Sequence, residues 1–142
     1  MKSFRQFLLE TQASQDASRE VHPSAAALLK NPEGKYLILQ RGSTAPWMPN
    51  KWGLPGGGIE DKETPEHAAY RETQEETQIS PSNLKFAEKI NYPDYTLHLF
   101  TGLFDGEPKL NFEHIAFALI NKEEIDKYDL VPDLANVIKR HI

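Results

Sequence analysis

The segment from Gly53 to Ile79, GLPGGGIEDKETPEHAAYRETQEETQI, limits the possible fold and chemistry of this chain more than any other stretch. After its glycine-rich start come Thr64 and Pro65, a capping hydroxyl followed by a residue that is tolerated at the first helical position. No further glycine or proline follows until Pro81. This pattern predicts a helix that begins near Pro65 and carries a dense group of glutamates.

Three of these glutamates fall within about one turn of the predicted helix. Glu72 and Glu76 are four residues apart, Glu75 lies between them, and Arg71 precedes Glu75 by four residues, so all four side chains share one surface. Like charges at this spacing destabilise a helix by about 0.2–0.5 kcal/mol per pair, which favours a bound cation over an empty cluster. A carboxylate cluster without imidazole or thiolate partners suits Mg²⁺ or Mn²⁺ better than zinc. A solvated helix face is the alternative.

The glycines before the cluster favour the metal interpretation. The stretch GLPGGG allows close backbone approach, so that carbonyl groups can face a metal and amide groups can face phosphate oxygens. It is not a nucleotide-binding P-loop, which would end in Gly-Lys-Ser/Thr, and it is not a dinucleotide fingerprint.

Composition limits the class of protein. A chain of 142 residues with 39% hydrophobic and 26% charged residues predicts one globular domain. The net charge of -5 argues against extended nucleic-acid binding, although the end of a nucleic acid could still be a substrate. The absence of cysteine excludes disulfides, a thiol nucleophile and thiolate-held zinc. The apolar runs are too short for a membrane helix and the N-terminus lacks a signal-peptide core, so we expect no membrane partner and a cytoplasmic protein.

The chain divides into two parts. Residues 1–20 place Phe4, Phe7 and Leu8 at helical spacing before a polar stretch, which predicts an amphipathic segment and linker. We expect this segment to dock on the domain; a targeting or partner-binding peptide is the alternative. Residues 21–142 predict the folded domain, with apolar runs of strand length before and after the central helix and two helices at the C-terminal end, the last with Pro132 in its first turn. This order predicts an α/β sandwich with a mixed sheet.

The glycine and glutamate segment resembles the signature box of the Nudix hydrolases, including MutT-like members. These residues match the family's pattern at its spacing: Gly57, Glu63, Arg71, Glu72, Glu75, Glu76 and Ile79. Two positions depart from it, Thr73 in place of an aliphatic residue and Gln78 in place of a glycine. We expect Thr73 to soften helix packing and Gln78 to make the following loop atypical. A weaker resemblance extends from about Ser24 to the C-terminal part and implies a Nudix-type α/β/α sandwich.

The resemblance implies a metal-dependent pyrophosphohydrolase that cleaves the diphosphate linkage of a nucleoside diphosphate derivative. The implied metal ligands are Glu72, Glu75, Glu76 and the backbone carbonyl of Gly56. A carboxylate would take the proton from a metal-activated water that attacks phosphorus. Arg71 would orient a glutamate, most simply Glu75, and Glu63 would tie the loop to the helix. Glu113, part of a Glu-His pair that recurs in family members, would be a further ligand or the base, with a surface glutamate as the alternative.

The substrate is less constrained. The amide of Gly57 and the guanidinium of Arg41 are candidates to meet phosphate, with an exposed arginine at a strand end as the alternative for Arg41. Trp47 is the better candidate to stack on a base, and we expect Trp52 to pack structurally. A deoxynucleoside triphosphate, ADP-ribose, a dinucleoside polyphosphate and an RNA 5′ end all remain open, as does a homodimer.

Two other classes compete with the enzyme. A non-catalytic nucleotide-binding module of the same fold is one; it should have lost carboxylates of the box, yet all are kept. The other is a structural metal-binding protein of a different fold.

Overall fold

The computed structural model describes residues 20–142, so the predictions for the N-terminal segment lie outside the described residues except at its last position. The elements, in chain order, are β1 (Pro23–Lys30), β2 (Tyr36–Arg41), β3 (Trp52–Gly53), β4 (Gly56–Gly58), α2 (Pro65–Thr77), β5 (Ser82–Asn91), β6 (Thr96–Leu103), β7 (His114–Ile120), the 3₁₀ helix η1 (Lys122–Lys127) and α3 (Leu134–Arg140).

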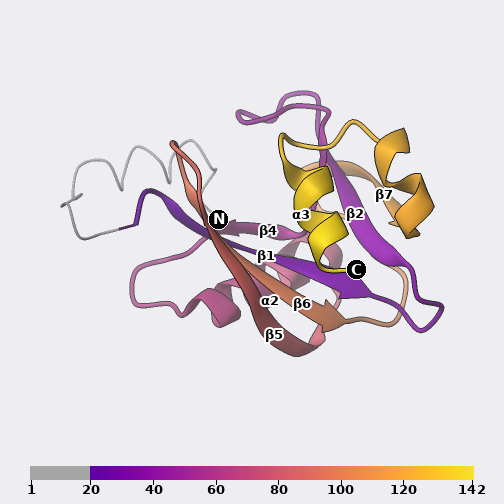
Figure 1. The fold of residues 1–142 in the computed structure, drawn as a ribbon, viewed down its shortest axis with the longest axis horizontal. Coiled ribbons are helices and arrows are strands. Elements are labelled where there is room, and N and C mark those ends of the chain that lie inside the picture. The colour runs from indigo at the N-terminus through magenta and orange to yellow at the C-terminus, as the bar shows by residue number, and fades with distance from the viewer. Residues whose placement is uncertain (1–19) are drawn as a thin grey trace.

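The strands of the described residues form one mixed sheet with β1 near its middle (Figure 1). β1 pairs in parallel with β6 along its whole length and antiparallel with β4 and β2 on its other side. The remaining pairs, β2 with β3, β2 with β7 and β5 with β6, are antiparallel. The predicted mixed sheet is confirmed.

Side chains of β1 alternate between the two faces of the sheet, as the strand repeat requires. Leu28 joins a buried cluster with α3, whereas Ala25 packs with Ala68 and Ala69 of α2. Helices α2 and α3 therefore cover opposite faces, which Figure 1 shows. This arrangement is the predicted α/β/α sandwich.

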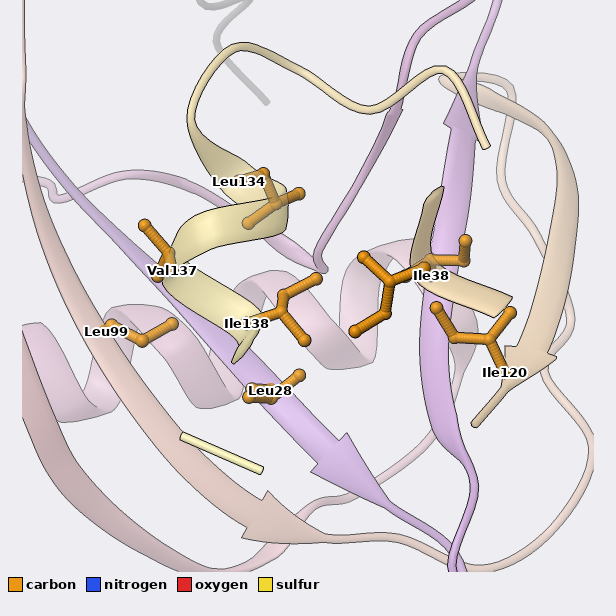
Figure 2. Packing of buried hydrophobic residues seen from close by; sticks show 8 residues of the cluster. Leu28, Ile38, Leu99, Ile120, Leu134, Val137 and Ile138 are labelled. Carbon is orange, nitrogen blue, oxygen red and sulfur yellow. The ribbon is translucent and has the colours of Figure 1, made fainter. Parts of the chain in front are cut away.

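The larger apolar cluster lies between α3 and the sheet (Figure 2). Leu134, Val137 and Ile138 of α3 are buried against residues from four strands and from η1. The strand and η1 residues of this cluster are Leu28, Ile38, Leu99, Ile120 and Ile125. Most of the fold's aliphatic packing on this face therefore depends on one short helix.

Three local predictions need correction. The prolines and glycines from Ser43 to Gly58 predict a loop, but this stretch contains β3, which pairs with β2, and β4, which pairs with the more distant β1. The first C-terminal helix is a 3₁₀ helix. The last helix begins at Leu134, after Pro132, because Asp133 adopts the left-handed conformation (φ 70°), which cannot continue a right-handed turn.

Candidate active site

Helix α2 begins as the sequence predicts. The side chain of Thr64 accepts a hydrogen bond from the backbone N–H of His67 (3.1 Å), and Pro65 occupies the first turn. The helix runs unbroken to Thr77. Its glutamates therefore stand at true helical spacing.

The helix turns two of its three clustered glutamates inward. Glu72 and Glu76 are buried, while the side chain of Glu75 is 36% exposed beside Arg71. Inward-facing carboxylates are unusual, because burying an ionised group without a partner is costly.

Two glycines allow the backbone of β4 to reach these carboxylates. The N–H of Gly56 donates to Glu76 Oε1 (2.9 Å), and a Cβ at Gly56 would lie 2.4 Å from the carbonyl oxygen of Ala25. A Cβ at Gly57 would lie 2.6 Å from the carboxyl carbon of Glu72. Real Cβ atoms do not approach backbone so closely, so space requires a glycine at position 56, whereas a Cβ at position 57 would displace the carboxylate of Glu72.

Arg71 ties the loop before α2 to the carboxylates. Its Nε and Nη2 donate to the two oxygens of Glu63 (2.7 and 2.9 Å), and Nη1 donates to Glu72 Oε1 (2.9 Å). Its contacts with Glu75 are longer, at 3.3 and 3.4 Å. Arg71 therefore orients Glu72 more directly than Glu75, and Glu63 ties loop to helix as expected.

A distant segment brings Glu113 and His114 to the end of α2. The N–H of Lys109 donates to the carbonyl of Thr77 (2.9 Å), and the N–H of Asn111 donates to the carbonyl of Glu76 (3.3 Å). The Asn111 side chain accepts from the N–H of Glu113 (3.0 Å). Ligand atoms of Glu76, Glu113 and His114 consequently lie within 4.8 Å of one another.

These acidic groups are held in a poorly solvated place. Burial raises the pKa of Glu72 to about 7, although the neighbouring Arg71 lowers it. Burial, together with the charge of Glu72, raises the pKa of Glu76 well above its usual range. Burial also raises the pKa of Glu113 and lowers that of His114 to about 4. Several groups that are ionised in water thus become difficult to ionise together.

The donor set fits a divalent cation. Buried carboxylates that repel one another are stabilised by a positive ion between them. The Nδ1 atom of His114 is buried and has no hydrogen-bond partner within residues 20–142. An imidazole therefore stands with the carboxylates, which corrects the premise that the cluster lacks one and widens the range of suitable ions.

The cluster opens into a cavity of about 310 Å³. Glu72, Glu76, Glu113, Gly56 and Gly57 all line it. The residues expected to meet substrate, Arg41 and Trp47, line it too. The structure thus brings every predicted site residue to the cavity except Glu75 and Arg71. Arg71 contacts Glu72 instead.

Arg41 is held inside the cavity. Its Nε donates to the carbonyl of Trp47 (2.7 Å), and its guanidinium carbon lies 5.2 Å from the centre of the Trp47 ring. An irregularity in the pairing of β2 with β7, between Gln40 and Arg41, accompanies this placement. Trp52, in contrast, packs edge-on against Tyr128 (5.0 Å) and belongs to the α3 cluster, as predicted.

Local sequence patterns do not reveal the places of two cavity residues, His114 and Tyr92. The Glu-His pair includes His114, but nothing in that pair shows that His114 completes the buried cluster. Tyr92 lines the cavity from the β5–β6 turn, but its place depends on sheet pairing that no local pattern reveals.

Comparison with known proteins identifies the family. The NUDIX domain matches residues 20–141. This chain belongs to the Nudix family. It is a Nudix hydrolase, an enzyme acting on phosphoric anhydride bonds, and hydrolases of this family use divalent metal ions.

Relatives agree with this assignment. The chain is 39% identical to the 8-oxo-dGTP diphosphatase of Escherichia coli over 89 residues, which cover 59% of this chain and 68% of that protein. It is 30% identical to the nucleoside triphosphatase NudI of Klebsiella pneumoniae over 119 residues, covering 72% and 84% of the two chains. A MutT protein from Methanosarcina mazei shares the fold, with a TM-score of 0.72 and 23% identity over 88% of this chain and 95% of its own. Within residues 20–142, no helix is long and apolar enough to span a membrane.

Proposed function

We propose that this Nudix hydrolase cleaves the diphosphate linkage of a nucleoside triphosphate and releases a nucleoside monophosphate and pyrophosphate. The observation that carries the proposal is the pair of buried carboxylates, Glu72 and Glu76, packed against the glycines of β4 at a cavity large enough for a small ligand. The names of the two relatives described above support a nucleoside triphosphate over the other derivatives.

The residues divide into those that would hold the ion and those that would hold the substrate. Glu72, Glu76 and Glu113 would bind the divalent ion, Mg²⁺ or Mn²⁺, with Glu75 and the carbonyl of Gly56 as further ligands. When bound, the ion would neutralise phosphate charge and lower the pKa of a water molecule. These carboxylates would otherwise repel the substrate.

Arg41 and Gly57 would bind the phosphates. Arg41 lines the same cavity as Glu76 and Glu113 and interacts electrostatically with both carboxylates, so a cation stands in the cavity together with the cluster. Gly57, which has no side chain, would let a phosphate approach the backbone of β4 closely. Trp47, held against Arg41, would contact the base.

Arg71 and Glu63 would act on the carboxylates and not on the substrate. Their paired hydrogen bonds fix Oε1 of Glu72, which Arg71 contacts, and so hold the carboxylate of Glu72 where this residue lines the cavity. Glu113 would either add a ligand or accept the proton of the attacking water.

A product assay tests the proposal. Pyrophosphate and phosphate release should be followed over a panel of nucleoside triphosphates, ADP-ribose and dinucleoside polyphosphates, with Mg²⁺, with Mn²⁺ and with EDTA. We expect pyrophosphate from triphosphates and no release in EDTA. Nucleotide binding without turnover of any member would instead favour the non-catalytic binding module.

The Glu113→Gln variant separates the two roles of that residue. A ligand role predicts a higher half-saturating Mg²⁺ concentration, whereas a base role predicts a lower kcat at saturating Mg²⁺.

The cytoplasmic location and the absence of extended nucleic-acid binding stay predictions, as does the possibility of a homodimer. The net charge of -5 supports the second of these.

A further inference from the structure

Three aromatic side chains form a continuous wall of the cavity, and they come from two different loops. Tyr92 and Tyr95 of the β5–β6 turn stack with ring centroids 4.8 Å apart and planes 28° apart. Tyr95 meets Trp47, from the loop after β2, edge-on at 5.7 Å. All three residues line the cavity. We call Trp47, Tyr95 and Tyr92 the aromatic wall.

The turn that carries the two tyrosines is anchored from outside. Its backbone is closed by the N–H of Tyr92 donating to the carbonyl of Tyr95 (2.9 Å). The hydroxyl of Tyr92 then donates to Asp133 Oδ2 at 2.6 Å, the short distance typical of a hydroxyl bonded to a carboxylate. Asp133 stands at the start of α3, so this bond joins the aromatic wall to the helix that covers the opposite side of the sheet from α2.

Asp133 makes this bond from a strained conformation. Its φ of 70° lies in the left-handed region, which costs an ordinary residue free energy. Its carboxylate does not cap α3 in the described part of the chain, although capping is the usual role of an aspartate in that position. The carboxylate is used instead by Tyr92 and by the amide of Asn136 (3.3 Å).

The two residues next to Asp133 in the chain place it at the edge of the cavity. Pro132 and Leu134 both line the cavity, although Leu134 also belongs to the α3 core cluster. The strained residue therefore sits where α3, the core and the cavity meet, with its side chain committed to the wall.

We propose that Asp133 is a positioning residue for the nucleobase. By holding the Tyr92 hydroxyl it fixes the Tyr92 ring, and through the stack it fixes Tyr95 and the aromatic wall as a surface for a planar aromatic base. Fixed rings bind a base more tightly because less rotamer freedom is lost on binding. This inference rests on the proposed function, since it assumes that the cavity takes a nucleotide.

Two substitutions remove the same bond from its two ends. Tyr92→Phe keeps the ring and removes the hydroxyl. Asp133→Gly removes the carboxylate and places glycine where φ is positive, so relief of strain offsets the lost bond and the fold is retained. Asp126→Asn is the matched control, because Asp126 of η1 also holds α3 through its carboxylate, in an exposed ion pair with Lys139 (3.0 Å).

The experiment measures substrate binding and turnover separately. For a nucleoside triphosphate, each variant should raise KM by about threefold to tenfold, the scale of one lost hydrogen bond, and leave kcat within about twofold. The dissociation constant of the nucleoside monophosphate, measured by calorimetry, should rise equally. The inhibition constant of inorganic tripolyphosphate should not change, because it has no base. The double variant should be no worse than either single one.

The outcomes separate the two proposals. Unchanged KM and monophosphate affinity in both variants would show that the bond serves packing alone and would overturn the positioning role, as would an equal loss for tripolyphosphate. A wild-type protein that binds monophosphate but hydrolyses no triphosphate would refute the proposed function, while the monophosphate affinities would still test Asp133. A wild-type protein that binds no nucleotide would overturn both.

Discussion

Helices α2 and α3 cover opposite faces of one sheet, yet they bury different kinds of side chain. The buried residues of α2 are Ala68, Ala69, Glu72, Thr73, Glu76 and Thr77. Those of α3 are Leu134, Val137 and Ile138. One helix buries small, polar and charged groups, and the other buries aliphatic groups only. Because burial of aliphatic surface stabilises a fold and burial of charge does not, stability and chemistry are separated onto the two faces.

The polar groups buried on α2 are nevertheless satisfied. Thr73 Oγ1 donates to the carbonyl of Ala69 (2.8 Å), and Thr77 Oγ1 donates to that of Thr73 (2.6 Å). Thr73, which departs from the family pattern, is therefore fully buried without an unpaired hydroxyl. What remains costly on this face is the pair of carboxylates, which the proposed metal ion would stabilise.

The largest effect is expected on the α3 face. Ile138→Ala removes a fully buried side chain from the core cluster and should lower the free energy of unfolding by about 2–5 kcal/mol. The Lys139→Ala control, which breaks only an exposed ion pair, should cost less than about 1 kcal/mol. Denaturant unfolding measures both. Equal losses would mean that α3 does not supply the core.

The next effect is expected on the α2 face, and in activity. Glu76→Gln should lower kcat by about 10²- to 10³-fold, equivalent to about 2.7–4 kcal/mol, the scale seen when a key electrostatic group is removed. Glu66→Gln, at an exposed position in the first turn of the same helix, should leave kcat unchanged. Near-normal turnover of the Glu76 variant would refute the assigned site.

The order of stability of the wild type and the Glu76→Gln variant should reverse when metal is added. In EDTA, Glu76→Gln relieves the repulsion with Glu72 and should melt no lower than the wild type. In millimolar Mg²⁺ the wild type should gain more, because an ion that binds only the folded state raises stability as its concentration passes the dissociation constant. An equal shift of both proteins would argue against a metal at these carboxylates.

The sequence predicts the α2 face well because its information is local. The cap at Thr64, the unbroken run to Thr77 and the spacing of Glu72 and Glu76 all depend on neighbours within a few residues. Once the position of the sheet is known, the helical spacing decides which side of the helix is buried. The Nudix resemblance adds the same residues, since its signature is itself a local pattern.

The remainder depends on contacts between distant residues. Strand β4 was missed because glycines usually indicate loops, whereas Gly56 is a glycine so that Ala25 and Ala26 of β1 can pack against it. His114 joins the site through the anchoring of its loop to the end of α2. The left-handed Asp133 has its partner 41 residues earlier in the chain, at Tyr92. The secondary-structure propensities of single residues do not reveal any of these contacts between distant segments.

A smaller effect should appear where α2 meets its preceding loop. The hydrogen bond from Arg71 lowers the pKa of Glu63 to about 2, so the ionised form stabilises the fold. Glu63→Gln should therefore cost about 1.5–3 kcal/mol at pH 7, the range for hydrogen bonds to charged groups. The deficit should be complete above pH about 4.3, the ordinary pKa of glutamate, and should shrink as the pH falls towards 2.

Melting curves in EDTA from pH 7 to pH 2.5 measure this deficit. Glu60→Gln is the control, because its exposed carboxylate lies 3.9 Å from Arg71. A deficit that stays constant with pH would show that Glu63 stabilises by packing and not by charge.

The smallest effect concerns the end of α2, where this chain departs from its family. Gln78 is the C-terminal cap, with φ 60° and its N–H donating to the carbonyl of Gln74 (2.9 Å). The left-handed conformation explains why the family places glycine here. Gln78→Gly should relieve about 1–2 kcal/mol of strain and lose about 0.4–1 kcal/mol through the freer unfolded chain, a net gain of about 0.5–1 kcal/mol.

Gly34→Ala is the reverse control, because Gly34 has φ 81° with open space around it and should lose a similar amount. Denaturant unfolding of both variants gives the signs. A loss of stability in Gln78→Gly would mean that the glutamine side chain contributes more than its backbone conformation costs, and the polar face of α2 would then extend to its cap.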